Sequence, residues 1–281
     1  MKFLVTGSGT LLGNKIVSEL SKKKHNIIAS YRNTYPSNLN KKNISLIKLD
    51  LEKKFKLNLK VDCLVHCASA IPSDNLNDKK MMKINYLSFK KLASQLIKNG
   101  CKKIIFISSM SVYGDIKVSK VDLNTYTKPI DTYGKSKLKV EKFLKELERK
   151  KNIKFFILRL PALVGVNSDY NFISKVLKKI KANKVVNYSN PNLKFNNFIH
   201  VKNLTNIIIK LIDIEKSKIL NIASNRPIKL KNIINLMFQF EKKKNNSIVQ
   251  KFNKKGFNIN KNNYLKKNFN IFFNFKNFKF F

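Results

Sequence analysis

The chain carries, at residues 5–13, the stretch Val5-Thr6-Gly7-Ser8-Gly9-Thr10-Leu11-Leu12-Gly13. Residues 2–6 read as a short buried strand, and the apolar residues Ile16, Val17 and Leu20 follow the stretch at helical spacing. Strand, glycine-rich turn and helix in this order form the start of a dinucleotide-binding βαβ unit, in which backbone N–H groups and the helix N-terminus meet a pyrophosphate. An ordinary tight turn is the alternative interpretation, but this context is more specific than a glycine pattern alone.

The rest of the chain continues the alternation of strands and helices. Further strands are expected at 26–30, 44–49, 61–66, 103–108 and 155–160, and long helices at 78–98 and 132–151. Beyond residue 165 the pattern loosens: helices are expected at 172–180, 203–214 and 230–240, strands at 198–201 and 219–222, and a polar loop at 189–197. Alternating elements indicate a mostly parallel sheet with right-handed crossovers.

We therefore predict an α/β fold with a doubly wound, mostly parallel Rossmann sheet and a small C-terminal substrate lobe. The dinucleotide-binding Rossmann domain is expected over residues 1–165. Residues 166–281 should form mainly the substrate-binding lobe, with 198–222 returning to the Rossmann core. The length of 281 residues suits such an arrangement, and an apolar content of 43% is sufficient for a core.

Several classes of protein are disfavoured by the composition. No run of about eighteen apolar residues exists, so we expect no membrane-spanning helix. The start, at residues 1–5, briefly resembles a signal peptide but runs into Thr6-Gly7-Ser8-Gly9 without a cleavage site, so we expect a cytoplasmic protein. The cysteines Cys63, Cys67 and Cys101 fall in or beside predicted strands and form no group with histidine. We interpret them as buried free thiols and predict no metal site.

The formal net charge of +42 raises the hypothesis of nucleic-acid binding. Against it, arginine, which is favoured for phosphate and base-edge contacts, occurs only at Arg32, Arg149, Arg159 and Arg226. The lysines are spread along the whole chain, which indicates a global compositional bias rather than a built patch. We predict no nucleic-acid partner, although the charge could attract anionic substrates such as nucleotide sugars.

Residues 269–281 alternate phenylalanine with lysine and asparagine. Such interleaving can bind single-stranded nucleic acid or a membrane surface. We favour a terminal segment that packs its aromatic side chains on the second lobe, and we predict no membrane partner.

The stretch Tyr133-Gly134-Lys135-Ser136-Lys137 places a tyrosine and a lysine four residues apart. On a helix these two side chains share one face, one turn apart. An ammonium beside a phenol favours the phenolate and lowers the pKa of the tyrosine, which is otherwise near ~10 and too high for proton transfer at neutral pH. In a chain so rich in lysine this spacing also arises by chance, so the pair needs support from the rest of the sequence.

Residues after the predicted strands supply that support. No acid follows the strand at 26–30, where Ser30-Tyr31-Arg32 stands; Arg32 could pair with a 2′-phosphate, which favours NADP, with NAD as the alternative. A solvated arginine at a strand end is the bland interpretation. Asp50-Leu51 follows the next strand, at a position expected on the adenine side. Small residues at 67–70 let the backbone approach a ligand, and the hydroxyls of Ser108 and Ser109 end a central strand, where open α/β sheets bind ligands.

Taken together, these stretches resemble the extended short-chain dehydrogenase/reductase superfamily, in particular its NAD(P)-dependent epimerase/dehydratase family of nucleotide-sugar enzymes. The stretches that carry the resemblance follow the family's order over nearly the whole chain. They are residues 5–13, His66-Cys67-Ala68-Ser69, Asn85, Ser108-Ser109-Met110-Ser111-Val112-Tyr113-Gly114, Tyr133-Gly134-Lys135-Ser136-Lys137, Leu158-Arg159-Leu160-Pro161, Phe198-Ile199-His200-Val201 and Leu220-Asn221-Ile222-Ala223.

The resemblance implies roles for individual residues. Tyr133 would be the catalytic acid/base, Lys137 would hold the nicotinamide ribose and lower the tyrosine pKa, and Ser109 would be the second donor to the reacting oxygen. Ser108 and Asn85 would support that site, and the backbone near Pro161 would meet the nicotinamide. The cofactor-binding residues expected are Gly7, Gly9, Thr10, Leu11, Leu12, Gly13, Arg32, Asp50, Leu51, Cys67, Ala68, Ser69, Asn85, Ser108 and Pro161.

The chain also departs from the family's pattern. Thr10 stands where the family usually has glycine, which makes the pyrophosphate contact less regular. Met110 and Ser111 stand where the dehydratases carry Asp-Glu, so a 4,6-dehydratase is disfavoured. Asn196 replaces an arginine that often precedes the strand at 198–201, and Lys194 could substitute for it. The substrate-binding residues expected are Ser111, Lys194 and Asn196.

Three hypotheses for the function follow. The first is a reductase of a nucleotide-linked 4-keto sugar that uses NADPH, favoured by Arg32 and a short second lobe. The second is a nucleotide-sugar 4-epimerase that retains NAD, and the third is a non-catalytic cofactor-sensing or nucleic-acid-binding protein on the same scaffold. A homodimer through the helices that contain Asn85 and Tyr133 is possible, as is common in the family.

Overall fold

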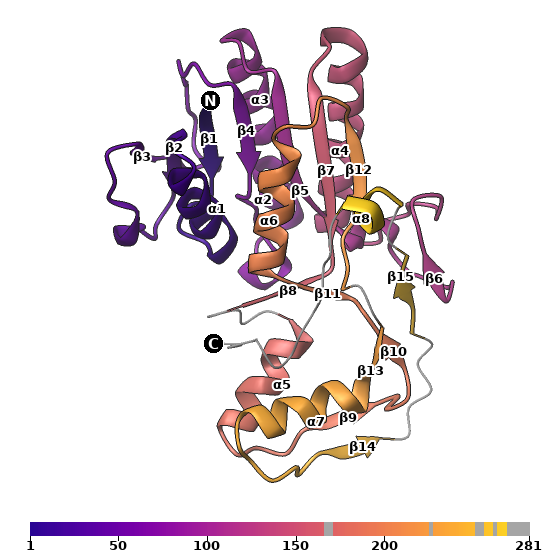
Figure 1. Cartoon of the computed structure of the whole chain (residues 1–281). Coiled ribbons are helices and arrows are strands. Elements are labelled where there is room, and N and C mark those ends of the chain that lie inside the picture. Colours follow the sequence, from indigo (N-terminus) through magenta and orange to yellow (C-terminus); the bar gives the residue numbers. More distant parts are fainter. Residues whose placement is uncertain (166–170, 225–226, 251–255, 261–262, 269–281) are drawn as a thin grey trace. The chain divides into compact units, whose positions relative to one another are not determined.

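The computed structural model describes residues 1–165, 171–224, 227–250, 256–260 and 263–268 (Figure 1). The interleaved segment at 269–281 therefore lies outside the described residues. The chain divides into two compact units, of which the first comprises residues 1–115, 126–159 and 201–220. The second comprises residues 116–125, 160–200 and 221–281. This division assigns 116–125 to the second unit, although the sequence analysis placed that segment in the Rossmann domain.

A seven-stranded sheet in the order β12-β7-β5-β4-β1-β2-β3 forms the centre of the first unit (Figure 1). Its strands are β1 (Lys2–Thr6), β2 (Asn26–Tyr31), β3 (Ile44–Lys48), β4 (Cys63–His66), β5 (Lys103–Ser109), β7 (Lys154–Leu160) and β12 (Lys218–Asn221). Strand β1 pairs in parallel with β2 on one side and β4 on the other, and the pairs β2–β3 and β4–β5 are parallel too. The order reverses between β1 and β4, which confirms the doubly wound fold and puts its topological switch point there.

The helices of this unit are amphipathic and lie along the sheet (Figure 1). They are α1 (Leu11–Lys22), α2 (Asp78–Met82), α3 (Ser88–Lys98), α4 (Thr132–Lys151) and α6 (Val201–Leu211). Helix α4 begins where Asp131 accepts a hydrogen bond from the Gly134 N–H at 2.7 Å, and its last turn carries basic residues that suit the helix dipole. The helix expected at 78–98 is interrupted by a π-helical segment, Lys83–Leu87, between α2 and α3.

Among the residues that the structure describes, the second unit contains short strand pairs and three helices. Strands β8 (Ala162–Val164) and β11 (Phe198–His200) pair in parallel, as do β9 (Asn187–Ser189) with β14 (Ile248–Gln250) and β6 (Lys120–Val121) with β15 (Asn258–Ile259). Strand β10 (Lys194–Phe195), inside the expected polar loop, pairs antiparallel with β13 (Ile228–Lys229). The helices are α5 (Phe172–Lys181), α7 (Leu230–Phe240) and α8 (Asn263–Asn268), and α5 and α7 share an apolar core that contains Leu177 and Ile233.

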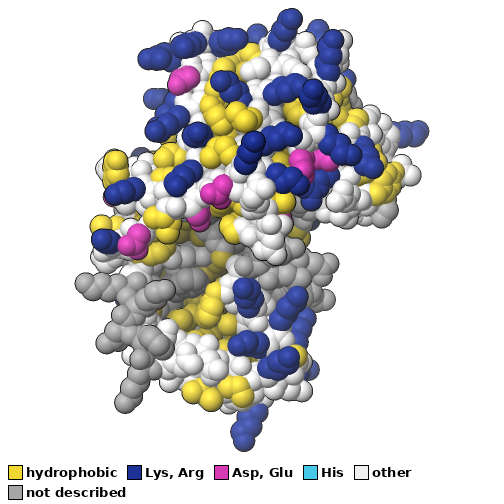
Figure 2. Space-filling model, turned by 180° about the vertical axis from the view of Figure 1, so that it is seen from behind, with side chains coloured by type: hydrophobic (Ala, Val, Ile, Leu, Met, Phe, Trp, Pro, Cys, Tyr) yellow, Lys and Arg dark blue, Asp and Glu magenta, His cyan; other side chains and the backbone are white. Residues whose placement is uncertain are grey.

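Cys63 and Cys101 are buried free thiols, and Cys67 is a free thiol that is partly buried. Within the described ranges, no helix combines the length and the apolar character that crossing a membrane requires. Lysine and arginine side chains are spread over the face of the molecule that Figure 2 shows, and few acidic side chains lie among them.

Candidate active site

The glycine-rich turn between β1 and α1 brings the ends of β1 and β4 together. Gly7 has a φ of +72°, and a Cβ atom placed on it would lie 2.9 Å from the backbone nitrogen of Ala68. A Cβ atom on Gly13 would lie 2.2 Å from the Gly7 carbonyl oxygen, so helix α1 can start this close to the turn only because residue 13 is glycine. Both close approaches occur at the switch point of the sheet, where ligands bind in folds of this kind.

Thr10, the departure from the family's glycine pattern, is the N-cap of helix α1. Its hydroxyl donates to the Gly7 carbonyl at 2.8 Å and accepts from the Gly13 N–H at 3.3 Å. Leu11 and Leu12 begin the helix, and N–H groups of a first turn have no partner inside their own helix. The irregular spacing therefore still produces the capped helix N-terminus that an anionic diphosphate requires.

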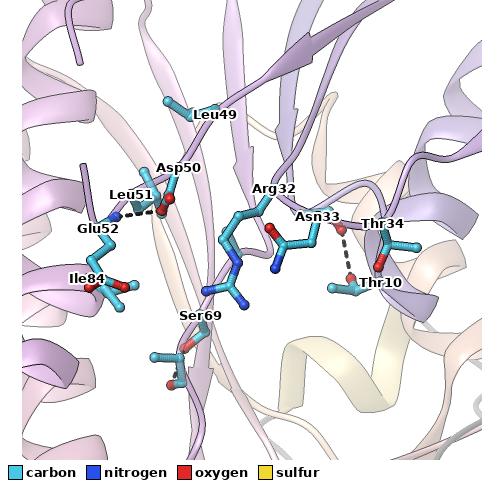
Figure 3. A pocket seen from close by; sticks show the side chains of 14 residues that line it. Thr10, Arg32, Asn33, Thr34, Leu49, Asp50, Leu51, Glu52, Ser69 and Ile84 are labelled. Carbon is cyan, nitrogen blue, oxygen red and sulfur yellow. Dashed lines mark hydrogen bonds between the residues drawn. The ribbon is translucent and has the colours of Figure 1, made fainter. Parts of the chain in front are cut away.

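A pocket of about 240 Å³ opens beside this turn. Its lining residues are Gly7, Gly9, Thr10, Arg32, Asn33, Thr34, Leu49, Asp50, Leu51, Glu52, Ala68, Ser69, Ala70 and Ile84. Figure 3 shows the side chain of Arg32 extending into it, with Asp50 and Glu52 on one side and Asn33 and Thr34 on the other. A Cβ atom on Gly9 would lie 2.4 Å from the Thr34 carbonyl oxygen. The glycine-rich turn and the backbone at Thr34 therefore lie too close together for a side chain at residue 9.

Eight of the expected cofactor-binding residues line this pocket together: Gly7, Gly9, Thr10, Arg32, Asp50, Leu51, Ala68 and Ser69. Five lining residues were not expected, namely Asn33, Thr34, Leu49, Glu52 and Ile84, while Ala70 was expected only as one of the small residues after β4. Most of them are direct neighbours of expected residues, so the position of Arg32 and Asp50 at strand ends was the signal that could have found them. Glu52 also forms an ion pair with Lys80 at 2.8 Å, which no local pattern indicates.

The loop after β4 is held in place by a buried threonine and a buried histidine. The Thr6 hydroxyl contacts His66 Nδ1 at 2.9 Å. The same hydroxyl oxygen accepts hydrogen bonds from the N–H groups of Cys67 and Ala68, both at 3.2 Å. Burial, together with the nearby charge of Lys137, lowers the pKa of His66 to about 3, so the imidazole is neutral at pH 7. His66 therefore acts here as a structural support for Cys67 and Ala68 beside the pocket.

Tyr133 and Lys137 lie on the first two turns of α4, as their spacing predicted. The Lys137 ammonium nitrogen donates to the Ile107 carbonyl of β5 at 2.9 Å and lies 5.5 Å from the centroid of the Tyr133 ring. It also lies 5.0 Å from the centroid of the Phe106 ring. Burial lowers the pKa of Lys137 to about 7, although the neighbouring Cys67 and Glu141 groups act in the opposite direction.

The expectation that Lys137 lowers the pKa of Tyr133 is not met. Burial raises the pKa of Tyr133 to about 12, while hydrogen bonds with the hydroxyls of Ser109 and Ser69 lower it. The lysine lies over the ring rather than beside the phenolic oxygen and is held by the Ile107 carbonyl, so withdrawal from water dominates. Burial of this kind cannot be read from the spacing of two residues.

A chain of hydrogen bonds links Ser69 back to the helix that carries Tyr133. The Ser69 hydroxyl donates to Asn85 Oδ1 at 3.1 Å, and Asn85 Nδ2 donates to the Ser136 hydroxyl at 3.2 Å. Ser136 in turn donates to the Tyr133 carbonyl at 2.7 Å. Asn85, on the π-helical segment, also exchanges two hydrogen bonds with the backbone of Ala70. The structure thus places Ser69 at the tyrosine hydroxyl, whereas the sequence analysis gave it only a cofactor contact.

Ser109 and Ser111 form a second group at the tyrosine. Ser109 caps the short 3₁₀ turn Met110–Tyr113, because its hydroxyl accepts from the Ser111 N–H at 3.1 Å and contacts the Ser111 hydroxyl at the same distance. Tyr133 is therefore approached by two serine hydroxyls from different elements. One comes from the end of β5 and the other from the loop after β4.

The remaining expected residues fall in two groups. Leu11, Leu12, Gly13, Cys67, Asn85 and Ser108 belong to the first unit but do not line the pocket. Pro161, Lys194 and Asn196 belong to the second unit. The buried amide of Asn196 is engaged with Ile259, because its Nδ2 donates to the Ile259 carbonyl at 2.8 Å and its Oδ1 accepts from the Ile259 N–H at 2.9 Å. This arrangement gives Asn196 a structural task, and substrate binding by Lys194 and Asn196 stays a prediction.

Comparison with known proteins places this site in context. The model of the NAD dependent epimerase/dehydratase family matches residues 3–223. A UDP-glucose 4-epimerase of Vibrio cholerae is 26% identical over 226 residues, which are 76% of this chain and 67% of that protein. A protein of Methanocaldococcus jannaschii described as a putative UDP-glucose 4-epimerase is 30% identical over 193 residues, which are 62% of this chain and 63% of that protein.

The fold is also found in solved structures. The UDP-glucose 4-epimerase of Thermotoga maritima, crystallised with UDP-glucose, superimposes with a TM-score of 0.79 at 18% identity. The superposition covers 95% of this chain and 92% of that one. At this level of identity the likeness shows that the two chains share their fold.

Proposed function

Because the chain belongs to the NAD dependent epimerase/dehydratase family, we propose that it is a nucleotide-sugar 4-epimerase in which Tyr133 is the acid/base. The observation that carries the proposal is the position of the Tyr133 hydroxyl, which two serine hydroxyls contact and which lies on the same helix face as Lys137. The names of the relatives favour the epimerase over the reductase that the sequence analysis put first. UDP-glucose is the substrate that those names suggest for a first test.

The residues around the pocket fit a nicotinamide dinucleotide. Gly7, Gly9 and Gly13 let the backbone pack closely around the turn beside the pocket, and the capped first turn of α1 suits a diphosphate. Asp50 and Leu51, which line the pocket, would contact the adenine, and Arg32 the adenosine ribose. When bound, the nicotinamide supplies an acceptor and donor for one hydride. Arg32 supports NADP through its positive charge, whereas the carboxylates of Asp50 and Glu52 in the same pocket support NAD, which lacks the 2′-phosphate.

In the proposed reaction the chain's own residues manage the proton and the charge on the sugar oxygen. Tyr133, as phenolate, takes the proton of the sugar 4-hydroxyl while the hydride leaves C4, and returns it when the hydride comes back to the other face of the ketone. Ser109 donates a hydrogen bond to that oxygen and stabilises its partial negative charge. Protonated Lys137, one helical turn from Tyr133, would hold the nicotinamide ribose.

The proposal is tested by incubating the purified chain with UDP-glucose, without added cofactor and then with NAD or NADP, and by measuring UDP-galactose. Replacing Tyr133 by phenylalanine should lower turnover by roughly 10²–10⁴-fold, because the acid/base is removed. Tyr126→Phe is the matched control, since Tyr126 is 80% exposed, and it should leave turnover unchanged. Equal turnover of the Tyr133→Phe and Tyr126→Phe proteins would contradict the proposed role.

Two other outcomes would point to the other hypotheses. Consumption of NADPH with a 4-keto nucleotide sugar, without interconversion of UDP-sugars, would identify a reductase. A rise in melting temperature with a dinucleotide, but no turnover of any nucleotide sugar, would identify a cofactor-sensing protein. The cofactor that raises the melting temperature more, NAD or NADP, decides between the two interpretations of Arg32.

A further inference from the structure

Glu141 is a buried carboxylate that the proposed mechanism does not use. It is 1% exposed, and its partner Arg159 is 4% exposed. Arg159 Nη2 donates to Glu141 Oε2 at 2.6 Å, and Arg159 Nε donates to both carboxylate oxygens at 3.1 and 3.2 Å. The Ser108 hydroxyl donates to Glu141 Oε1 at 2.6 Å. Both oxygens of this carboxylate therefore accept hydrogen bonds from other elements.

These contacts join the three elements that surround the candidate catalytic residues. Glu141 lies four residues after Lys137 on α4, so the two share one face of the helix. Ser108 on β5 lies between Ile107, whose carbonyl accepts from Lys137, and Ser109. Arg159 on β7 reaches on to the 3₁₀ turn that begins after Ser109, because its Nη1 donates to the Tyr113 hydroxyl at 2.7 Å.

Glu141 is also the source of negative charge beside Lys137. The titratable groups around Lys137 are Cys67, His66, Tyr133 and Glu141. At pH 7 the first three are neutral, because burial raises the pKa values of Cys67 and Tyr133 to about 12 and lowers that of His66 to about 3. Lys137, itself 3% exposed, therefore keeps its proton with the help of Glu141.

A role in stability alone does not account for this arrangement. A buried ion pair gains little over well-packed apolar side chains, because desolvation offsets the attraction between the charges. We propose that Glu141 is a positioning residue for the proposed reaction: it fixes Lys137 and Ser109 relative to one another through Ser108 and Arg159. The negative charge of Glu141 also favours the protonated form of Lys137. This inference rests on the proposed function for its effect on turnover, but not for its effect on Lys137.

The first test measures Lys137 itself, without substrate or cofactor. The pKa of Lys137 is followed by NMR of protein with isotope-labelled lysine, and its signal is assigned with the Lys137→Met protein. Glu141→Gln should lower this pKa by roughly one unit, because a negative charge that favours the protonated form of Lys137 is removed. The matched control is Glu146→Gln, an exposed glutamate on the same helix, which should leave the Lys137 pKa unchanged.

The second test follows the pH dependence of UDP-glucose turnover. The active state has Tyr133 as phenolate and Lys137 as ammonium, and its population rises with pH up to the pKa of Lys137, about 7. Between this pH and the pKa of Tyr133, about 12, the population forms a plateau, because the fraction of Tyr133 phenolate rises as fast as the fraction of Lys137 ammonium falls. Glu141→Gln should move the midpoint of the rise in turnover to lower pH by roughly one unit. It should also lower turnover on the plateau by roughly tenfold.

Further variants separate charge from position and from folding. Glu141→Asp keeps the charge but its side chain is too short to reach Ser108 in the same way. The midpoint of the pH profile should therefore stay in place, while turnover on the plateau should fall.

If Glu141→Gln fails to fold because Arg159 is left unpaired, the Glu141→Gln/Arg159→Met double variant removes both charges and should still lower the Lys137 pKa. An unchanged Lys137 pKa in whichever of these two carboxylate-free proteins folds would overturn the inference. If the native chain fails to turn over UDP-glucose, the proposed function fails, while the NMR result still decides the role of Glu141.

Discussion

At the scale of single residues, the two serine hydroxyls at Tyr133 carry the next prediction. With a pKa of about 12, the Tyr133 phenolate is scarce near neutral pH, so each hydroxyl that forms a hydrogen bond with Tyr133 and lowers this pKa matters for turnover. Ser69→Ala and Ser109→Ala should each lower the plateau of the pH profile by roughly tenfold, the value of one hydrogen bond to a charged group. The midpoint near pH 7 should stay in place, because it is determined by Lys137.

The measurement is the same pH profile of UDP-glucose turnover, with Ser73→Ala as control because Ser73 is an exposed serine of a nearby segment. The Ser69→Ala/Ser109→Ala double variant should lose at least the product of the single effects. If the Ser69→Ala protein has the same plateau turnover as the native protein, only Ser109 stabilises the phenolate.

How much of the site could be predicted differs from residue to residue. Tyr133, Lys137 and Ser109 were predicted because each belongs to a short local motif, and Arg32 and Asp50 because they follow strands; their roles stay predictions. Ser69, Glu141 and Arg159 gained their roles only through contacts with residues far away in the chain, which no local pattern contains. The direction of the Tyr133 pKa shift was wrong for a related reason, since desolvation depends on everything that covers the side chain.

At the scale of elements, the start of helix α1 depends on Gly13. A Cβ atom there would lie 2.2 Å from the Gly7 carbonyl oxygen. Because this oxygen belongs to the backbone, it cannot move aside by a change of side-chain rotamer. Gly13→Ala should therefore lower the free energy of unfolding by about 1–3 kcal/mol, the usual cost of overpacking, and abolish the rise in melting temperature with NAD or NADP. Ser18→Ala on the same helix is the control and should keep both quantities near their native values.

That measurement needs only thermal unfolding with and without dinucleotide. A Gly13→Ala protein that still responds to the dinucleotide would show that the turn can move and that the close approach of α1 to Gly7 is not required for binding.

The elements themselves were predictable in proportion to their length and periodicity. Helix α4 was expected with the bounds that it has, and strands β1 to β5 to within one or two residues, because each is a long or strongly apolar segment. Strands such as β6, β10 and β13 have two residues each, too few for any periodicity, and exist only because a partner lies beside them. The π-helical segment that carries Asn85 was also missed, since one extra residue in a turn leaves the apolar pattern nearly unchanged.

At the scale of the whole molecule, the charge governs stability as a function of salt. The sequence has 58 lysines and arginines against 16 acidic residues, and on the face that Figure 2 shows the basic side chains are spread out rather than gathered at one site. Exposed ion pairs such as Lys15 with Glu19 engage a small part of that charge and contribute little each. Repulsion among the remaining cations therefore destabilises the compact state.

Sodium chloride should accordingly raise the melting temperature of this protein, because screening weakens repulsion more than it weakens the few attractive pairs. The rise should be steepest at low salt and level off near ~0.15 M, where the Debye length has fallen to about 8 Å, comparable with the spacing of surface charges. Calorimetry at constant pH over a series of chloride concentrations measures it, and choline chloride serves as the control for effects specific to the sodium ion. A melting temperature that falls with salt would mean that attractive pairs dominate the electrostatics despite the excess of lysine.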